Sequence, residues 1–278
     1  MTAANSMHIR AAHHRRHASA GFSLIEMAMV LIIMTLVLGG LMMPLSAQIE
    51  QRNRTETQRT LEDAKEALIG YAVANGVLPC PSALDSSNIP TGVARTTCDT
   101  TNNSGYLPWA TLGVTKQDAW GNLFRYTVSP NFTVPIALNS ARTITIKSRD
   151  SNGGEVSLST ANDIPAVALS HGKNGYGAIN GDGILQYKPT GFVSSNPDEG
   201  TNAISNIKFF SRTPAPAGYA AAKGGEFDDM ITWLSPNILF NRMAAAGRLP
   251  PGPTATLTGT VEDTAGSVST LNGTITWP

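Results

Sequence analysis

The chain has 278 residues, of which 20 are basic and 20 are acidic, so its formal net charge is zero. The first 21 residues hold three arginines and no acid, which leaves 17 basic against 20 acidic residues in 22–278 and a net charge of −3. A mildly acidic chain lacks the basic patch that nucleic acid requires, so we expect no nucleic-acid partner. Residues 22–278 keep one histidine, His171, which excludes zinc sites built on two or three histidines.

Residues 22–47 form an apolar run that contains a single charge, Glu26. Because about 20 apolar residues cross a bilayer as a helix, the run predicts a transmembrane helix, with the basic residues 1–21 in the cytoplasm and the rest exported. A carboxylate in such a helix costs on the order of 3 kcal/mol and needs a cationic partner. If the chain were cut between Gly21 and Phe22, a new ammonium group would lie within one helical turn of Glu26.

The sequence Gly21-Phe22-Ser23-Leu24-Ile25-Glu26, followed by an apolar helix, resembles the processing signature of type IV prepilins and type II secretion pseudopilins. The resemblance implies that a prepilin peptidase cuts after Gly21 and N-methylates Phe22. It also implies that Glu26 guides assembly of the subunits into a filament. The alternative is an uncleaved membrane anchor in which this motif occurs by chance.

Residues 48–75 predict that the helix continues beyond the apolar run. Leu61, Ala64, Leu68 and Ala72 recur at three- and four-residue spacing and form one apolar face, while charged residues cover the other faces. Asn75-Gly76 is a stop signal. We therefore expect a single long helix with a transmembrane half and an amphipathic half.

The remaining chain predicts a globular domain over 77–250 and a β-rich or flexible tail over 251–278. Short runs that alternate or are rich in β-branched residues predict strands at 123–129, 143–148, 155–159, 166–170 and 183–187. Cys80 and Cys98 are the only cysteines, and in an exported domain such a pair indicates a disulfide. Two free thiols in a cytosolic protein are the alternative. The expected fold is α+β and pilin-like, with the long helix packed on a small antiparallel sheet.

The loop Ser170-His171-Gly172-Lys173-Asn174-Gly175 is similar to a loop that holds calcium in the major pseudopilins, together with a later Asp-Asp pair. The resemblance implies a calcium site formed by Asn174, Asp228 and Asp229. Calcium prefers six to eight oxygen ligands, which carboxylates, amide oxygens and loop carbonyls supply. The alternative is that Asp228 and Asp229 begin a helix over 230–234, since acidic residues are favourable at a helix start. A second short helix is expected after Ser235, with Pro236 at its first position.

Together these patterns predict a structural subunit rather than an enzyme. The subunit would be a minor one in a type IV pilus or a type II secretion pseudopilus. Its partners would be the prepilin peptidase, other pilin or pseudopilin subunits and an inner-membrane assembly platform. Its location would be the inner membrane, by a single span with the C-terminal domain in the periplasm, and then the filament. The alternative is a membrane-anchored periplasmic ligand-binding or hydrolytic domain.

Overall fold

The computed structural model describes residues 21, 23–186, 195–248, 254–262 and 268–276, without the side chains of 38–45 and 254–276. The predicted leader and Phe22 therefore lie outside the described residues, apart from Gly21. The chain divides into two compact units, Met1–Glu50 and Gln51–Pro278. The long helix α1 (Leu24–Asn75) belongs to both units and ends as predicted, where the N–H of Gly76 donates to the carbonyl of Ala72.

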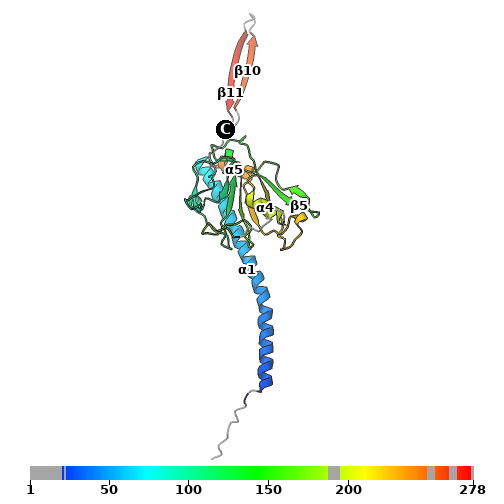
Figure 1. Cartoon of the computed structure of the whole chain (residues 1–278). Coiled ribbons are helices and arrows are strands. Elements are labelled where there is room, and N and C mark those ends of the chain that lie inside the picture. Colours follow the sequence, from blue (N-terminus) through cyan, green and yellow to red (C-terminus); the bar gives the residue numbers. More distant parts are fainter. Residues whose placement is uncertain (1–20, 22, 187–194, 249–253, 263–267, 277–278) are drawn as a thin grey trace, which may run out of the picture. The chain divides into compact units, whose positions relative to one another are not determined.

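The second unit is built from short strands and short helices (Figure 1). The helices are α2 (Trp109–Leu112), η1 (Pro130–Phe132), α4 (Pro197–Ile204), η2 (Ala221–Lys223) and α5 (Pro236–Ala245). The strands are β1 (Ser82–Leu84), β2 (Pro90–Ala94), β3 (Ser104–Tyr106), β4 (Arg125–Val128), β5 (Thr145–Arg149), β6 (Glu155–Ser157), β7 (Ala166–Ser170), β8 (Lys208–Phe210), β9 (Met230–Trp233), β10 (Thr254–Glu262) and β11 (Val268–Thr276).

The central sheet is antiparallel and has the strand order β3-β4-β7-β9. A second sheet has the order β6-β5-β8, and two further sheets are the pairs β1-β2 and β10-β11. The prediction of one small antiparallel sheet is therefore wrong in two respects. The described chain contains several sheets, and β5 pairs with β8 in parallel. That pairing joins segments about sixty residues apart, which alternation along each strand does not predict.

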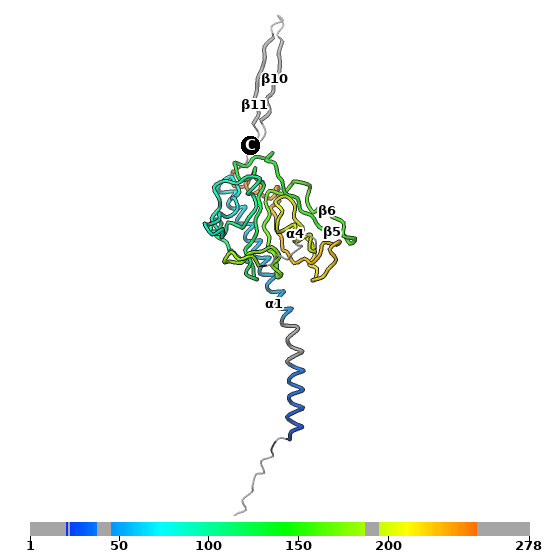
Figure 2. Tube along the Cα trace, viewed as in Figure 1, coloured from blue at the N-terminus to red at the C-terminus, as the bar shows by residue number. Residues whose placement is uncertain are grey.

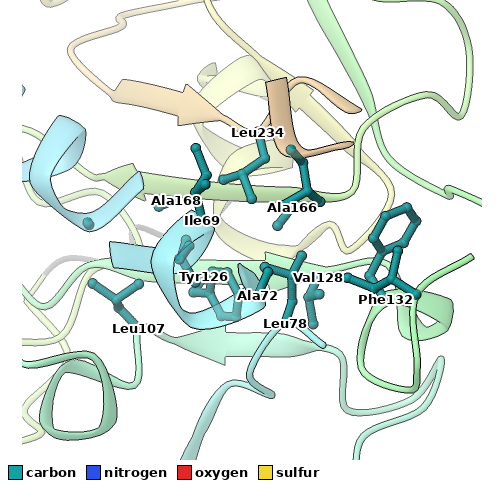
Figure 3. Packing of buried hydrophobic residues seen from close by; sticks show 14 of the residues in the cluster. Ile69, Ala72, Leu78, Leu107, Tyr126, Val128, Phe132, Ala166, Ala168 and Leu234 are labelled. Atoms are coloured by element: carbon teal, nitrogen blue, oxygen red, sulfur yellow. The ribbon is translucent and has the colours of Figure 1, made fainter. Parts of the chain in front are cut away.

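The main core lies between α1 and one face of the central sheet. Leu61, Ala64, Leu68 and Ala72 are fully buried, so the predicted apolar face of the helix is confirmed. Figure 3 shows Ile69 and Ala72 of this helix against Tyr126, Val128 and Ala168 of the central strands. The hydroxyl of Tyr126 donates to the carbonyl of Pro79 at 3.0 Å, which satisfies the polar end of that buried ring.

Strand β7 is buried on both of its faces. Ala166 and Ala168 point into the core with α1, while Val167 and Leu169 join a second core that contains Ile146 of β5 and Phe209 of β8. Because successive side chains in a strand point to opposite faces, one strand contributes to both cores. The helix α4 lies near β5 (Figure 2) and packs against β8. There the Asn202 side chain bonds both backbone groups of Phe210.

The expected transmembrane half of the helix is not supported. Within the described part of the chain, no helix has the length and apolar character that crossing a membrane requires. From Glu50 onward α1 is rich in charged residues. The fold is therefore α+β with mainly antiparallel sheets, and the predicted transmembrane half is wrong for the described residues.

Other predictions for single elements had mixed outcomes. Strands β4 to β7 and helix α5, with Ser235 before it and Pro236 first, are confirmed within a few residues. Residues 230–233 form β9 rather than the helix considered for 230–234. The described part of 183–187 forms only an isolated bridge between Ile179 and Leu185, and residue 187 lies outside the description. Part of the tail forms the hairpin β10–β11 (Figure 1).

Cys80 and Cys98 form the predicted disulfide, with 5.8 Å between their Cα atoms. Cys80 is buried, and Cys98 packs against the main core. The bond closes a loop of about 18 residues that contains β1 and β2.

We expect the double substitution Cys80→Ser with Cys98→Ser to lower the free energy of unfolding by about 3 kcal/mol, because the open chain gains loop entropy when it unfolds. For a domain of this size the melting temperature falls by on the order of 10 °C. Thermal melts with and without a reducing agent check this. The reducing agent should lower the melting temperature of the natural sequence and leave the variant unchanged. Equal melting of all four samples would contradict a stabilising disulfide.

Candidate metal centre

The centre lies where the loop after β7 meets the loop before β9. In the antiparallel pair, Ser170 at the end of β7 lies opposite Met230 at the start of β9. The segment that leaves β7 at His171 is therefore next to the segment that enters β9 through Asp228 and Asp229. Gly172 has a φ of +63°, and a Cβ placed there would lie 2.3 Å from Oδ1 of Asp228. Glycine is required at this position by both the backbone conformation and the close approach.

Three carboxylates converge at this point. One oxygen from each of Glu199, Asp228 and Asp229 lies within 4.8 Å of the other two. This spacing fits oxygens that share one calcium ion, whose ligands lie at about 2.3–2.6 Å. Asp229 and Glu199 are buried and Asp228 is half-buried. The sequence predicted the two adjacent aspartates as ligands, and the structure places Glu199 beside them.

Several ligand-type atoms in the centre carry no hydrogen bond. Oδ1 of Asp228, Oδ1 of Asp229 and Nδ1 of His171 are buried, and none of them has a hydrogen-bond partner among the described residues. Nδ1 of His171 lies 3.6 Å from Oδ1 of Asp229. Buried polar atoms without partners cost about 1–3 kcal/mol each, so they are uncommon in a folded core unless a ligand completes them. The donor set therefore fits a hard cation.

The remaining carboxylate oxygens are held by neighbouring donors. The backbone N–H of Asn174 donates to Oδ2 of Asp228 at 2.9 Å, and the amide of Asn202 donates to Oδ2 of Asp229 at 2.7 Å. The N–H of Asp228 donates to Oε1 of Glu199 at 2.8 Å. These bonds orient the carboxylates and leave Oδ1 of each aspartate without a hydrogen bond among the described residues.

Asn174 lies at the site, but its side chain is committed elsewhere. Its Oδ1 accepts from the N–H of Tyr176 at 2.9 Å, and its amide nitrogen lies 3.1 Å from both carboxylate oxygens of Glu199. The side chain predicted as a ligand thus supports a carboxylate that the sequence did not identify. The residues Asn196-Pro197-Asp198-Glu199 read as an acidic helix start, but nothing in that pattern indicates what the acid faces.

Burial and mutual repulsion raise the pKa of two of these acids. The pKa of Glu199 rises to about 9, first through desolvation and then through the charge of Asp229, against which the N–H of Asp228 acts. The pKa of Asp228 rises to about 7, again mainly by desolvation, with Asp229 and Glu226 adding to the rise. Arg54 and the N–H of Asn174 oppose it. A bound cation would favour the ionised forms.

The predicted processing and assembly residues lie at the other described site. Gly21 and Glu26 are exposed, while Phe22 lies outside the described residues. The N–H and hydroxyl of Ser23 donate to Glu26 at 2.8 and 2.9 Å, and the N–H of Glu26 lies 3.2 Å from the Ser23 hydroxyl. This reciprocal pairing is a capping box at the start of α1. The Ser-x-x-Glu spacing predicts it, although only the assembly role was inferred from the sequence.

Comparison of the chain with protein-family models, with characterised proteins and with solved structures finds no match.

We expect the metal-free protein to lose stability as pH rises from about 4 to 9. The folded pKa values of Glu199 and Asp228 lie above the ordinary values, so the folded state binds protons more tightly than the unfolded chain. The contribution of these two acids to the free energy of unfolding is fully present below about pH 4. It is lost as the pH rises through their folded pKa values. In a chelator, the melting temperature should be lower at pH 8.5 than at pH 5 by on the order of 5 °C. Calcium chloride should raise the melting temperature more at pH 8.5 than at pH 5. A calcium effect that is equal at both pH values would contradict this account.

Proposed function

We propose that this chain is a structural subunit of a pilus-like or pseudopilus-like filament, processed after Gly21 and N-methylated on Phe22. The observation that carries the proposal is the exposure of apolar side chains at the start of α1. Eleven large apolar side chains between Leu24 and Val37 are from 49% to 90% exposed. A helix that is apolar on all sides requires a covering, and the equivalent helices of neighbouring subunits supply one. Glu26 stands at the exposed end of this helix, next to the motif that would create a cationic terminus.

Two features of the second unit support the same class. Helix α1 packs its apolar face on an antiparallel sheet, so that one element serves the domain core and begins with an exposed apolar stretch. The disulfide supports export to an oxidising compartment, where such bonds persist. The partners in this proposal are the prepilin peptidase, other filament subunits and an assembly platform. The sheet β6-β5-β8 and the hairpin β10–β11 are separate from the central sheet. These extra elements favour a minor subunit over the bulk subunit of a filament.

We further propose that the acidic centre binds calcium. Asp228 and Asp229 would hold the ion through the oxygens that lack partners, and the ion would neutralise the repulsion between buried carboxylates. Its role would be structural, since it would join the loop after β7 to the loop before β9. A hydrolytic role is the alternative, and His171 beside Asp229 is the feature that raises it. The hydroxyl of the adjacent Ser170 donates to Asp118 at 2.6 Å, so it is not paired with that histidine.

The filament proposal predicts a processed N-terminus. Intact-mass and N-terminal peptide analysis of the protein from producing cells should show a chain that begins at N-methyl-Phe22. The same analysis from cells without prepilin peptidase should show residues 1–21 retained. A chain that keeps residues 1–21 in both cells would reject the filament class.

Glu26 provides a second test, in which Ser23 is the matched control. We expect Glu26→Gln to reduce incorporation into sheared filaments at least tenfold, because the pairing with a neighbouring terminus is lost. Ser23→Ala breaks the capping box and keeps the carboxylate, at a cost of about 1 kcal/mol, so it should reduce incorporation much less. Quantitative immunoblots of filament and cell fractions measure both. Equal loss in the two variants would assign Glu26 to helix capping alone.

The calcium proposal is tested by substituting both aspartates. Asp228→Ala with Asp229→Ala should abolish the rise in melting temperature that calcium chloride gives the natural sequence. The control is Asp182→Ala, which removes an exposed acid from a turn outside the centre. A calcium response that survives the double substitution would place the ion elsewhere.

A further inference from the structure

The two acids that begin α4 face opposite ways. Asp198 accepts from Arg149 of β5 at 2.6–2.9 Å and from Arg212 at 2.7 Å, and it is fully buried. Its charge is therefore balanced by two guanidinium groups. The adjacent residue, Glu199, is equally buried but turns toward Asp228 and Asp229. One short helix thus carries a compensated acid on one side and an uncompensated acid on the other.

The neighbours of Glu199 are donors without charge or acids of the same sign. Asn174 and the N–H of Asp228 donate to it, and Asn196 adds a longer contact of 3.4 Å. Among the charged groups, Asp229 and Asp228 repel it, which is part of why its pKa is raised. The arginines near the group act on the two aspartates, Arg54 on Asp228 and Arg125 on Asp229, while Glu199 is held by neutral donors. A cation at the centre removes that repulsion.

A second observation, independent of the acid cluster, points to a ligand. Nδ1 of His171 is buried, has no hydrogen-bond partner among the described residues and faces Asp229 at 3.6 Å. His171 itself is only 1% exposed. The histidine does not belong to the group of atoms that lie within reach of one ion. Its Nδ1 lies near the Asp229 oxygen that has no hydrogen bond among the described residues, so a second buried polar group without a hydrogen bond stands beside a candidate ligand oxygen.

Asn174 brings no negative charge, and both polar atoms of its side chain already have partners. Its oxygen accepts from Tyr176 and its nitrogen faces Glu199, so rotating the amide would break both interactions. Glu199 instead lies within 4.8 Å of both aspartate oxygens. The loop carries the neutral amide of Asn174, so the third negative charge comes from Glu199 on the separate helix α4.

We infer that Glu199 is a ligand of the cation at this centre, and that the ion thereby fastens α4 to the loops that flank β7 and β9. This inference rests on the cation site proposed above. All three anionic ligands are carboxylates, so the ion is a hard divalent cation of the calcium type rather than zinc. The Asn202 amide already links α4 to Asp229 at 2.7 Å. The ion adds a second link at the start of the same helix.

The contacts of α4 indicate which readout to use. Its side-chain bonds to the rest of the domain include those of Asp198 to arginines, of Asn202 to Phe210 and Asp229, and of Glu199 to neutral donors. With the ion bound, the helix would be held at its first turn on both sides. Backbone amides of 197–204 should therefore exchange hydrogen at least fivefold more slowly with calcium present.

The experiment uses the full-length chain purified in detergent and three variants. Glu199→Gln keeps the shape and removes the charge, and Glu199→Asp keeps the charge on a shorter side chain. Glu226→Gln is the matched control, an acid in the same loop as Asp228 that lies outside the three-carboxylate group. Calorimetric titration with calcium chloride gives the affinity. Melting in a chelator gives the stability of the metal-free form, and hydrogen exchange reports on α4.

We expect Glu199→Gln to weaken calcium binding at least tenfold. At alkaline pH, where Glu199 is ionised, it should also raise the melting temperature of the metal-free protein, because it removes repulsion. Glu226→Gln should change the affinity less than threefold. A purely structural Glu199 gives the opposite pattern, with a lower metal-free melting temperature and unchanged affinity, which would overturn the inference but keep the site. If Glu199→Gln fails to fold, an unchanged affinity in Glu199→Asp would overturn it. No calcium binding by the natural sequence would overturn both the inference and the cation site, and would leave the filament proposal standing.

Discussion

The pairing of β7 with β9 is the interaction on which most of the second unit depends. Strand β7 is buried throughout, so its alternate side chains must fill two cores at once. Its partner β9 continues into α5, which adds Leu239 and Met243 to the core with α1. Because the pair is antiparallel and in register to its end, the loop that leaves β7 must meet the loop that enters β9. The acidic centre is thus a consequence of the same register that builds the core.

That position explains why the carboxylates remain close in spite of their charge. Backbone donors at Asn174 and Asp228 and the amide of Asn202 each hold one oxygen. The sheet register brings the loops of the two backbone donors together, and Asn202 comes from α4. Desolvation then acts against ionisation, as the raised pKa values of Glu199 and Asp228 show. The fold can respond in two ways, by keeping protons on these acids or by binding a cation. The choice depends on pH and on the ion concentration, since protons and cations compete for the same oxygens.

The parts of the fold that were predictable are those that local patterns determine. The buried face of α1, its end at Gly76 and the start of α5 follow from spacing, a positive-φ glycine and a proline. Strand β9 was ambiguous because four apolar or β-branched residues fit a helix or a strand equally well. Glu199 could not be found, because its role depends on Asp228, which lies 29 residues further along. The transmembrane expectation followed from hydropathy and the basic residues before the apolar run, and no helix in the described part of the chain meets it.

The start of α1 raises the question of how one carboxylate can cap its own helix and also pair with another subunit. A capping interaction contributes about 1 kcal/mol, and in this structure Glu26 makes it through one oxygen, Oε2. A charge-assisted hydrogen bond to an ammonium contributes about 1.5–3 kcal/mol, more than the cap. The carboxylate has four lone-pair sites, so it can accept from an ammonium while Ser23 still donates. Capping in the free subunit is therefore compatible with pairing in a filament, because the cap orients the acid before the partner arrives.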